Sequence, residues 1–210
     1  MEHLGIIEIL GLAGSLSLLA GWRLYLCILA TGIAMNFGAL PLPEHLDGLQ
    51  VLANPWVMGI AGIATVVEFF ADKIAWLDSA WDAVHTAIRP IGGALLALAV
   101  VDPSDPATQV IAFILGGGAT LLAHGGKAAS RAVVNTSPEP VSNIAVSTTE
   151  DIVTGGLLFA AYQFPEIAIA IALVLLAIMI GLALIARRIL RRLFGRREPA
   201  TGQNVDPPPA

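Results

Sequence analysis

The chain has 210 residues, of which 56% are hydrophobic and 13% are charged, and its mean hydropathy is +0.79. Soluble domains carry about 25% charged residues, so this chain has too few of them to cover a water-facing surface. The composition excludes a soluble enzyme and a nucleic-acid-binding protein, and it indicates an integral membrane protein.

The basic residues are concentrated near the carboxyl end. Residues 187–210 contain six basic and two acidic residues, whereas residues 1–186 contain five basic and fourteen acidic ones. Cytoplasmic segments of membrane proteins are rich in Lys and Arg, and anionic lipid attracts each of them by about 1 kcal/mol. We therefore expect a cytoplasmic carboxyl terminus and an anionic-lipid anchor formed by Arg187, Arg188, Arg191 and Arg192.

The first apolar block, residues 4–37, is longer than the roughly 20 residues that cross a bilayer. It contains several glycines and Arg23, so we expect it to be tilted or broken. The segment 38–54 has no Lys or Arg and is predicted as an outer loop. Pro55 is a favourable first helical residue, and a second span is predicted over 55–70.

An amphipathic helix is predicted next, over residues 74–89. Pro90 is expected to kink or restart it, leaving a short apolar helix over 91–101. After an acidic turn at 102–106, a full span is predicted over 107–123. The amphipathic helix carries a first polar stripe on one face, formed by Asp78, Asp82, His85 and Arg89.

A second polar stripe follows the 107–123 span, with the helical spacing of His124, Lys127, Arg131 and Asn135. Residues 136–151 are predicted as turns that end in a helix start capped by Ser147 or Thr148, with Glu150 and Asp151 in its first turn. A short apolar helix over 152–162 and a last span over 166–186 complete the predicted elements. The Pro-rich segment 198–210 is predicted to be disordered.

These elements predict an all-α, polytopic transmembrane helix bundle of about six membrane elements, two of them short, in one domain over 1–197. Both termini would then be cytoplasmic, in the inner membrane. A layout of span, polar stripe and short helix occurs twice, over 55–101 and 107–162. Repeats of this kind are common in transporters, where interrupted segments flank the substrate site. The oligomeric state stays open, with Gly116–Gly118 as a candidate contact for a second copy.

The charges of the two stripes are complementary. An ionisable group near the bilayer centre costs at least about 2.5 kcal/mol, so such groups face a protein interior or a water-filled cavity. The first stripe and the preceding Glu68 and Asp72 are mostly acidic, whereas Lys127 and Arg131 make the second stripe basic. We expect the two stripes to face each other.

Several of these residues carry a family resemblance. The segment from Glu68 to Asp82, followed by Arg89-Pro90 and Gly92-Gly93, resembles the bacterial membrane family catalogued as domain of unknown function 4126. The second stripe, Ser137-Pro138, residues 147–151 and Gly21-Trp22-Arg23 share the resemblance, which covers residues 5–165. It implies an integral membrane protein and no particular reaction. The match departs at Ala75, where the family pattern has Pro, so the local turn there is less well defined.

Each polar group has a functional and a structural interpretation. Glu68, Asp72 and Lys73 would bind a cation or relay protons, or else cap a span at the interface; we favour the functional role. The first stripe would line a cavity or form the wet face of a surface helix, which we favour. The second would bind an anionic substrate group or, as we favour, reach ordinary lipid phosphates.

Arg23 has no adjacent partner in its own span, so we expect it to pair with an acidic group of another helix or to contact substrate. Turn formation and helix capping are the favoured roles of the polar residues further along, Asn135, Ser137, Asn143 and Ser147.

Motifs of hydrolases, zinc enzymes and nucleotide-binding proteins are absent from the sequence, and we expect no enzymatic activity, no cofactor and no metal. An intramembrane enzyme acting on lipid phosphate is a weaker alternative, because it would need a nucleophile or a metal beside the second stripe.

The leading hypothesis is a gradient-driven or passive transporter or channel for a small ion, solute or lipid headgroup. Its polar seam between the two units would be formed by Glu68, Asp72, Asp78, Asp82, Arg89, Lys127 and Arg131. The alternative is a scaffold that binds anionic lipid or a partner membrane protein. A continuous hydrated cleft reaching Glu68 would favour transport, whereas charges all paired at the interface would favour the scaffold.

Overall fold

The structure, a computed structural model, describes residues 6–37, 44–101, 104–135 and 140–194. The described residues form α-helices and one 3-10 helix and contain no strand. The predicted disordered segment 198–210 lies outside the described residues. In chain order, the elements are α1 (Ile6–Asn36), η1 (Glu44–Ala53), α2 (Pro55–Ala71), α3 (Ala75–Leu98), α4 (Pro106–Val134), α5 (Pro140–Gln163) and α6 (Pro165–Phe194).

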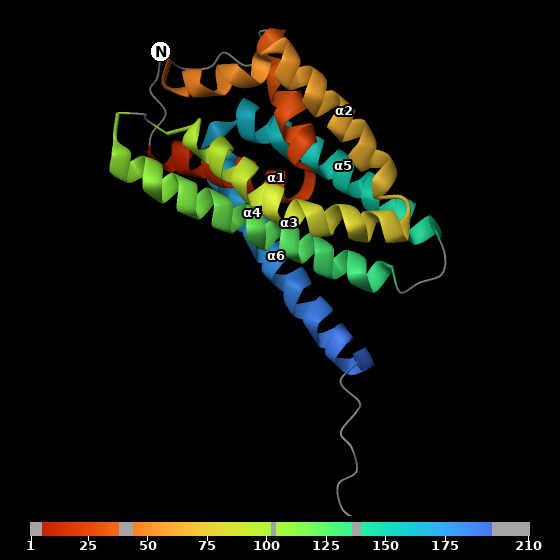
Figure 1. The fold of residues 1–210 in the computed structure, drawn as a ribbon. Coiled ribbons are helices and arrows are strands. Elements are labelled where there is room, and N and C mark those ends of the chain that lie inside the picture. Colours follow the sequence, from red (N-terminus) through yellow and green to blue (C-terminus); the bar gives the residue numbers. More distant parts are fainter. Residues whose placement is uncertain (1–5, 38–43, 102–103, 136–139, 195–210) are drawn as a thin grey trace, which may run out of the picture.

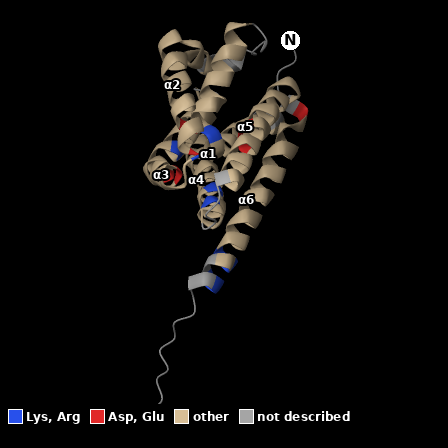
Figure 2. Ribbon diagram, turned by 90° about the vertical axis from the view of Figure 1, so that its right-hand side faces the viewer, with Lys and Arg blue, Asp and Glu red and all other residues tan. Residues whose placement is uncertain are grey.

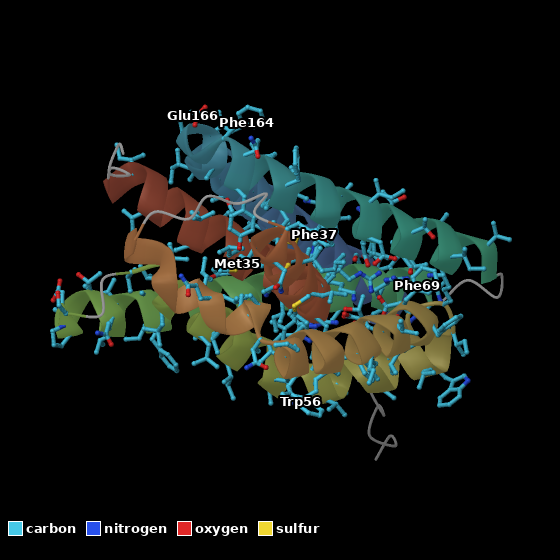
Figure 3. All side chains as sticks on the ribbon, turned by 90° about the horizontal axis from the view of Figure 1, so that it is seen from above. Met35, Phe37, Trp56, Phe69, Phe164 and Glu166 are labelled. Carbon is cyan, nitrogen blue, oxygen red and sulfur yellow. The ribbon has the colours of Figure 1, made fainter. Side chains whose placement is uncertain are left out.

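Four of these helices are long and apolar enough to cross a membrane, which confirms the predicted all-helical bundle of membrane-spanning character. The apolar stretches are Leu10–Asn36, Pro106–Val134, Val141–Gln163 and Glu166–Ile189. The carboxyl-terminal half of α6 extends beyond the rest of the bundle (Figure 1). The shorter α2 presents an apolar outer face, with Trp56 81% exposed and pointing away from the bundle (Figure 3).

α1 lies at the centre of the bundle and packs against every other element (Figure 1). Its backbone leaves the helical conformation at Arg23, where φ is −142° and ψ is 72°. The predicted break in the first apolar block is therefore confirmed. The amino-terminal half of α1 forms most of the apolar core with α6 and the end of α3.

Glycines allow the close approach of α1, α3 and α4. A methyl group on Gly21 would lie 2.6 Å from the Thr120 carbonyl oxygen of α4. A methyl group on Gly116 would lie 2.5 Å from the Cβ atom of Ala97 in α3. The glycine run 116–118 thus contributes to packing within the chain, and its Gly118 has open space beside it.

Two predicted helix boundaries are wrong. α3 continues through Pro90, which lies inside the helix, because α3 packs against α4 along its length and this packing outweighs the lost backbone hydrogen bond. α5 begins at Pro140 and not at Ser147, since proline is favourable in the first turn of a helix. The predicted short helices are therefore the ends of longer ones. Residues 91–98 end α3, and residues 152–162 belong to the last part of α5.

The two predicted units also differ in where their helices end. The first break, after Ala71, comes before the first polar stripe, so that stripe lies in α3 with the following apolar run. The second stripe continues the span of α4 without a break. The predicted outer loop 38–54 includes the helix η1, Glu44–Ala53.

Candidate functional site

Charged side chains meet inside the bundle, where the break in α1 lies against α2, α3, α4 and α5. Figure 2 shows Lys, Arg, Asp and Glu gathered there, with a second basic group at the end of α6. Eight of these side chains are paired with one another, and each residue is at most 8% exposed. We call them the charge network: Arg23, Glu68, Asp72, Asp82, Arg89, Lys127, Arg131 and Glu150.

Arg23 connects α1 to two other helices. Its guanidinium pairs with Asp72 at the end of α2 and, through Nη2, lies 3.4 Å from Glu150 Oε2 of α5. Its Nε atom lies 2.8 Å from Asp151 Oδ1, and that carboxylate is 24% exposed. The predicted pairing of Arg23 with an acidic group of another helix is confirmed.

Asp72 is the carboxylate with the most cationic partners. Besides Arg23, Lys127 Nζ lies 3.1 Å and Arg131 Nη2 lies 3.6 Å from Asp72 Oδ2. Burial raises the pKa of Asp72, but Lys127, Arg23 and Arg131 outweigh it and lower the pKa to about 2. Asp72 is therefore ionised at neutral pH, and Arg131 also reaches Glu150 at 3.2 Å.

The network continues from α4 to α3 through Lys127. The Nζ atom of Lys127 lies 4.0 Å from Glu68 Oε1 and 4.0 Å from Asp82 Oδ1. Arg89 pairs with the same two carboxylates, at 3.2 Å from Asp82 Oδ1. Acidic and basic groups thus alternate from Asp151 at the α5 side to Arg89 in α3, so the two predicted stripes do face each other.

The break in α1 adds backbone oxygens to the network. Lys127 Nζ donates a hydrogen bond to the Trp22 carbonyl at 3.3 Å, and Arg89 Nη1 donates one to the Gly21 carbonyl at 3.3 Å. Both carbonyls immediately precede Arg23, where the helix is interrupted. The interrupted helix therefore supplies main-chain acceptors to two buried cations.

The hydrogen bonds of the two buried histidines define their tautomers. Arg89 Nη1 donates to His124 Nδ1 at 2.7 Å, so the proton of this ring is on Nε2, near the Thr86 hydroxyl. His85 Nδ1 donates to the Trp81 carbonyl at 2.7 Å, and its Nε2 accepts from the Tyr25 hydroxyl at 2.9 Å. Both rings are neutral in this arrangement.

Asp78 is buried beside the network but is not part of its ion pairs. Its Oδ2 atom accepts a hydrogen bond from Asn135 Nδ2 at 3.1 Å, and Asn135 also donates to the Ala75 carbonyl at 3.3 Å. Burial raises the pKa of Asp78 to about 6, although the positive charge of Arg131 opposes this. Asp78 therefore differs from Asp72, which the surrounding cations keep ionised.

Six of the seven predicted seam residues belong to the charge network, and Asp78 adjoins it. The surface-helix interpretation of the first stripe is wrong, because Asp78, Asp82, His85 and Arg89 are each at most 5% exposed. The lipid-phosphate interpretation of the second stripe is also wrong, because His124, Lys127 and Arg131 are each 1% exposed. The two stripes bury their polar groups against each other. This costs less free energy than burying the charges of one stripe without partners.

A third polar stripe, in α5, was not predicted. Ser147 lies within the helix and accepts hydrogen bonds from Lys73 Nζ at 3.2 Å and from Arg23, so it is not an amino-terminal cap. Asn143 Oδ1 accepts from Arg131 at 3.0 Å, so it too binds the network instead of forming a turn. The spacing of four, three and four residues was the available signal for this buried stripe, Asn143, Ser147, Glu150 and Thr154. Ser137, the remaining predicted turn residue, lies outside the described residues.

The network carboxylates are occupied by Arg and Lys nitrogens. Within the described ranges, no group of three or more His, Cys, Asp or Glu side chains is placed to hold a metal ion. Two mainly apolar cavities lie away from the network: one of about 280 Å³ between α1, α4 and α6, and one of about 140 Å³ near Tyr162. Neither is lined by a network residue.

The predicted lipid anchor lies far along the chain from the network. Arg187, Arg188, Arg191 and Arg192 are exposed on the carboxyl-terminal part of α6 and, with Leu184, line a shallow depression on that helix. Figure 2 shows this basic group separated from the charges in the bundle.

The sequence comparisons agree with the resemblance noted above. Residues 10–184 match the model of a protein family described as Domain of unknown function (DUF4126). No curated protein and no solved structure matches the chain. The departure at Ala75 falls on the first residue of α3, where alanine and proline both fit, and the preceding turn is held by a hydrogen bond of 3.1 Å from the Lys73 amide to the Phe70 carbonyl.

Proposed function

Because the chain belongs to the DUF4126 family, whose description assigns no activity, we propose from the geometry of the charge network that it is a transporter. It moves a small ion, a polar solute or a lipid headgroup through the bundle, passively or driven by a gradient. The observation that carries this proposal is the break of α1 at Arg23, inside the buried network and with two carbonyls directed at Lys127 and Arg89.

The energetics of burial support a functional role for the network. Replacing a buried ion pair by apolar residues of similar volume is often neutral or stabilising by about 1–4 kcal/mol. A bundle that needed only stability would therefore gain nothing from eight buried charges. Charges inside a membrane domain are instead the usual mark of an ion or substrate pathway.

The network residues would exchange partners during transport. Asp72, Glu68 and Asp82 each have two or more cationic groups within 4.0 Å, so a carboxylate can release one cation while it keeps another. The partly exposed Asp151 beside Arg23 is the proposed entry. Neither of the two apolar cavities reaches these groups, so the proposed transport requires the bundle to open beside the network.

We further propose that the protein lies in the bacterial inner membrane with both termini in the cytoplasm. The exposed arginines at the end of α6 support this orientation, because basic segments stay on the cytoplasmic side and bind anionic lipid.

The experiment is flux through the purified protein in liposomes. Three assays would follow proton flux with an internal pH dye, Na⁺ and K⁺ flux with ion-selective dyes, and lipid movement with a fluorescent phospholipid. We expect flux in at least one assay, lowered about tenfold in Glu68→Gln and in Lys127→Gln, equivalent to about 1.4 kcal/mol in the barrier. Glu166→Gln is the matched control, since Glu166 is exposed at the start of α6 (Figure 3).

The second candidate is a scaffold that binds anionic lipid or another membrane protein, and it is favoured because every residue of the network has an ion-pair partner within the network. The double variant Glu68→Gln/Lys127→Gln separates the two, because it removes one charge of each sign. A scaffold would keep its fold and its cellular phenotype in the double variant, whereas a transporter would keep its fold and lose flux. Folded wild-type protein without flux in all three assays would contradict transport of protons, Na⁺, K⁺ and lipid.

A further inference from the structure

One buried carboxylate in the bundle has no cationic partner. Asp78 is 0% exposed, and among the described residues no Lys, Arg or His nitrogen lies within 4.0 Å of its oxygens. The guanidinium that acts on Asp78 through its charge, that of Arg131, is bound to Asp72, Glu150 and Asn143. An isolated buried carboxylate is costly, so Asp78 is expected to carry a neutralising partner.

The hydrogen bonds around Asp78 identify that partner. Asn135 Nδ2 donates to Asp78 Oδ2 at 3.1 Å, but Asp78 Oδ1 and Asn135 Oδ1 are both buried and have no hydrogen-bond partner. Both of these atoms are acceptors while the carboxylate is ionised. A single proton on Asp78 Oδ1 would supply the missing donor, and the acid and the amide would then satisfy each other in a reciprocal pair.

We propose that Asp78 and Asn135 form a proton-binding site and that H⁺ is the ion coupled to transport. The proton forms an O–H bond at Asp78 Oδ1 and takes the carboxyl from charge −1 to 0, with no other bond changed. When it leaves, Asp78 becomes an unpaired buried anion and competes with Asp72 for Arg131. The coupling part of this inference rests on the proposed transport function, whereas the proton site does not.

The charges around Asp78 favour exchange near neutral pH. The positive charge of Arg131 in α4 favours the ionised form of Asp78. The negative charges of Asp72 at the end of α2 and Asp82 in α3 disfavour it. From the other helices packed nearby, Arg23 of α1 is directed to Asp72, and Glu150 of α5 is directed to Arg131. Burial adds to the two acidic neighbours and brings the pKa to about 6, so both protonation states are accessible in a cell.

The first experiment is an infrared pH titration of the purified protein in lipid nanodiscs, which detects the carbonyl band of a buried, protonated carboxyl. We expect this band in the wild type and its loss as the pH rises through about 6. Asp78→Asn should lack it, because an amide pair with Asn135 imitates the protonated form without titrating. Asn135→Asp should move the midpoint upward, since two adjacent carboxyls share one proton. Glu166→Gln should titrate like the wild type.

The second experiment is proton flux in liposomes with the same variants. We expect Asp78→Asn to stay folded and to lose flux about tenfold or more, and Glu166→Gln to keep it. If the titrating band is unchanged in Asp78→Asn, the proton site is wrong. If wild-type liposomes carry Na⁺, K⁺ or lipid at a rate that Asp78→Asn leaves unaltered, the coupling is wrong while transport stands. A titrating Asp78 in protein without any flux would support the site and contradict the proposed function.

Discussion

Asp72 is the residue on which most of the network depends. Arg23, Lys127 and Arg131 all direct nitrogens to this one carboxylate, and none of the four residues is more than 1% exposed. Removing its charge would leave three buried cations with one fewer negative charge to share, and uncompensated buried charge is the costly case. The pairing therefore holds the halves of α1 and the end of α2 in place.

We predict that Asp72→Asn lowers the free energy of unfolding by about 3–5 kcal/mol. Asp72→Asn/Lys127→Gln should cost less than the sum of the two single variants, because it removes a charge of each sign from one ion pair. Thermal unfolding in detergent, with Glu166→Gln as the exposed control, measures both effects. Additive losses in the double variant would contradict direct coupling of Asp72 and Lys127.

The pH dependence of stability tests the raised pKa of Asp78. Since the pKa of Asp78 is raised to about 6, above its value in the unfolded chain, its contribution to stability is present at pH 4 and is lost as pH rises through 6. We predict that the wild type loses stability over this window, relative to Asp78→Asn, and that the two curves separate further up to about pH 7. Melting temperatures of both proteins across pH 4–8 check the sign. A wild type whose melting temperature rises relative to that of Asp78→Asn as the pH increases would contradict this prediction.

Residue spacing predicted the network but not the burial of its members. Spacings of three and four residues placed each stripe on one helix face, and six of the seven proposed seam residues do pair with one another. The spacing does not distinguish a helix face that contacts water from one buried against other polar groups, because both give the same periodicity. Glu150 was missed because Ser147 and Glu150 fit a capping pattern as well as a third stripe.

Gly21 lies two residues before the break in α1, at the point where α1 contacts α4. The absence of a side chain there lets α4 approach, and this approach brings Lys127 within 3.3 Å of the Trp22 carbonyl. Any bulk at Gly21 would push α4 away from the discontinuity.

We predict that Gly21→Ala destabilises the protein by about 1–3 kcal/mol, because the new methyl group would lie 2.6 Å from the Thr120 carbonyl oxygen and the Ala123 Cβ atom. Gly118→Ala is the matched control in α4. Nothing lies within 4 Å of its added methyl group, so the better helix propensity of alanine should stabilise it by about 0.5–1 kcal/mol. Chemical denaturation of both variants measures the difference. Equal effects would mean that the close approach is not required.

The number of helices could be predicted from hydropathy, but their ends could not. Pro90 has the local signal of a break, yet α3 passes through it because its polar and apolar halves both pack against α4. Pro140 begins α5 because its fixed backbone angle φ suits the first turn of a helix. The polar residues that follow it have the composition of a loop, so the local sequence does not indicate this helix start. Long-range packing decides between these options, and local patterns do not report it.

The polar and apolar parts of the interior are separate. The apolar core lies along the amino-terminal half of α1 and α6, whereas the charge network lies where the break in α1 meets α2–α5. The only described basic groups outside this region, apart from Lys73 beside it, are on the exposed end of α6. With the other basic residues engaged inside the bundle, that end should dominate the orientation of the chain in the membrane.

We predict that replacing the six arginines between residues 187 and 197 by glutamine lets the carboxyl terminus cross to the opposite side in part of the population. Replacing the same six by lysine should leave the terminus in the cytoplasm, because the orientation bias counts positive charges and does not need the guanidinium geometry. A carboxyl-terminal fluorescent protein that matures only in the cytoplasm, paired with an enzyme reporter active only outside it, measures the two populations. Identical orientation of the glutamine and lysine variants would show that helix packing, and not the arginine charge, determines the topology.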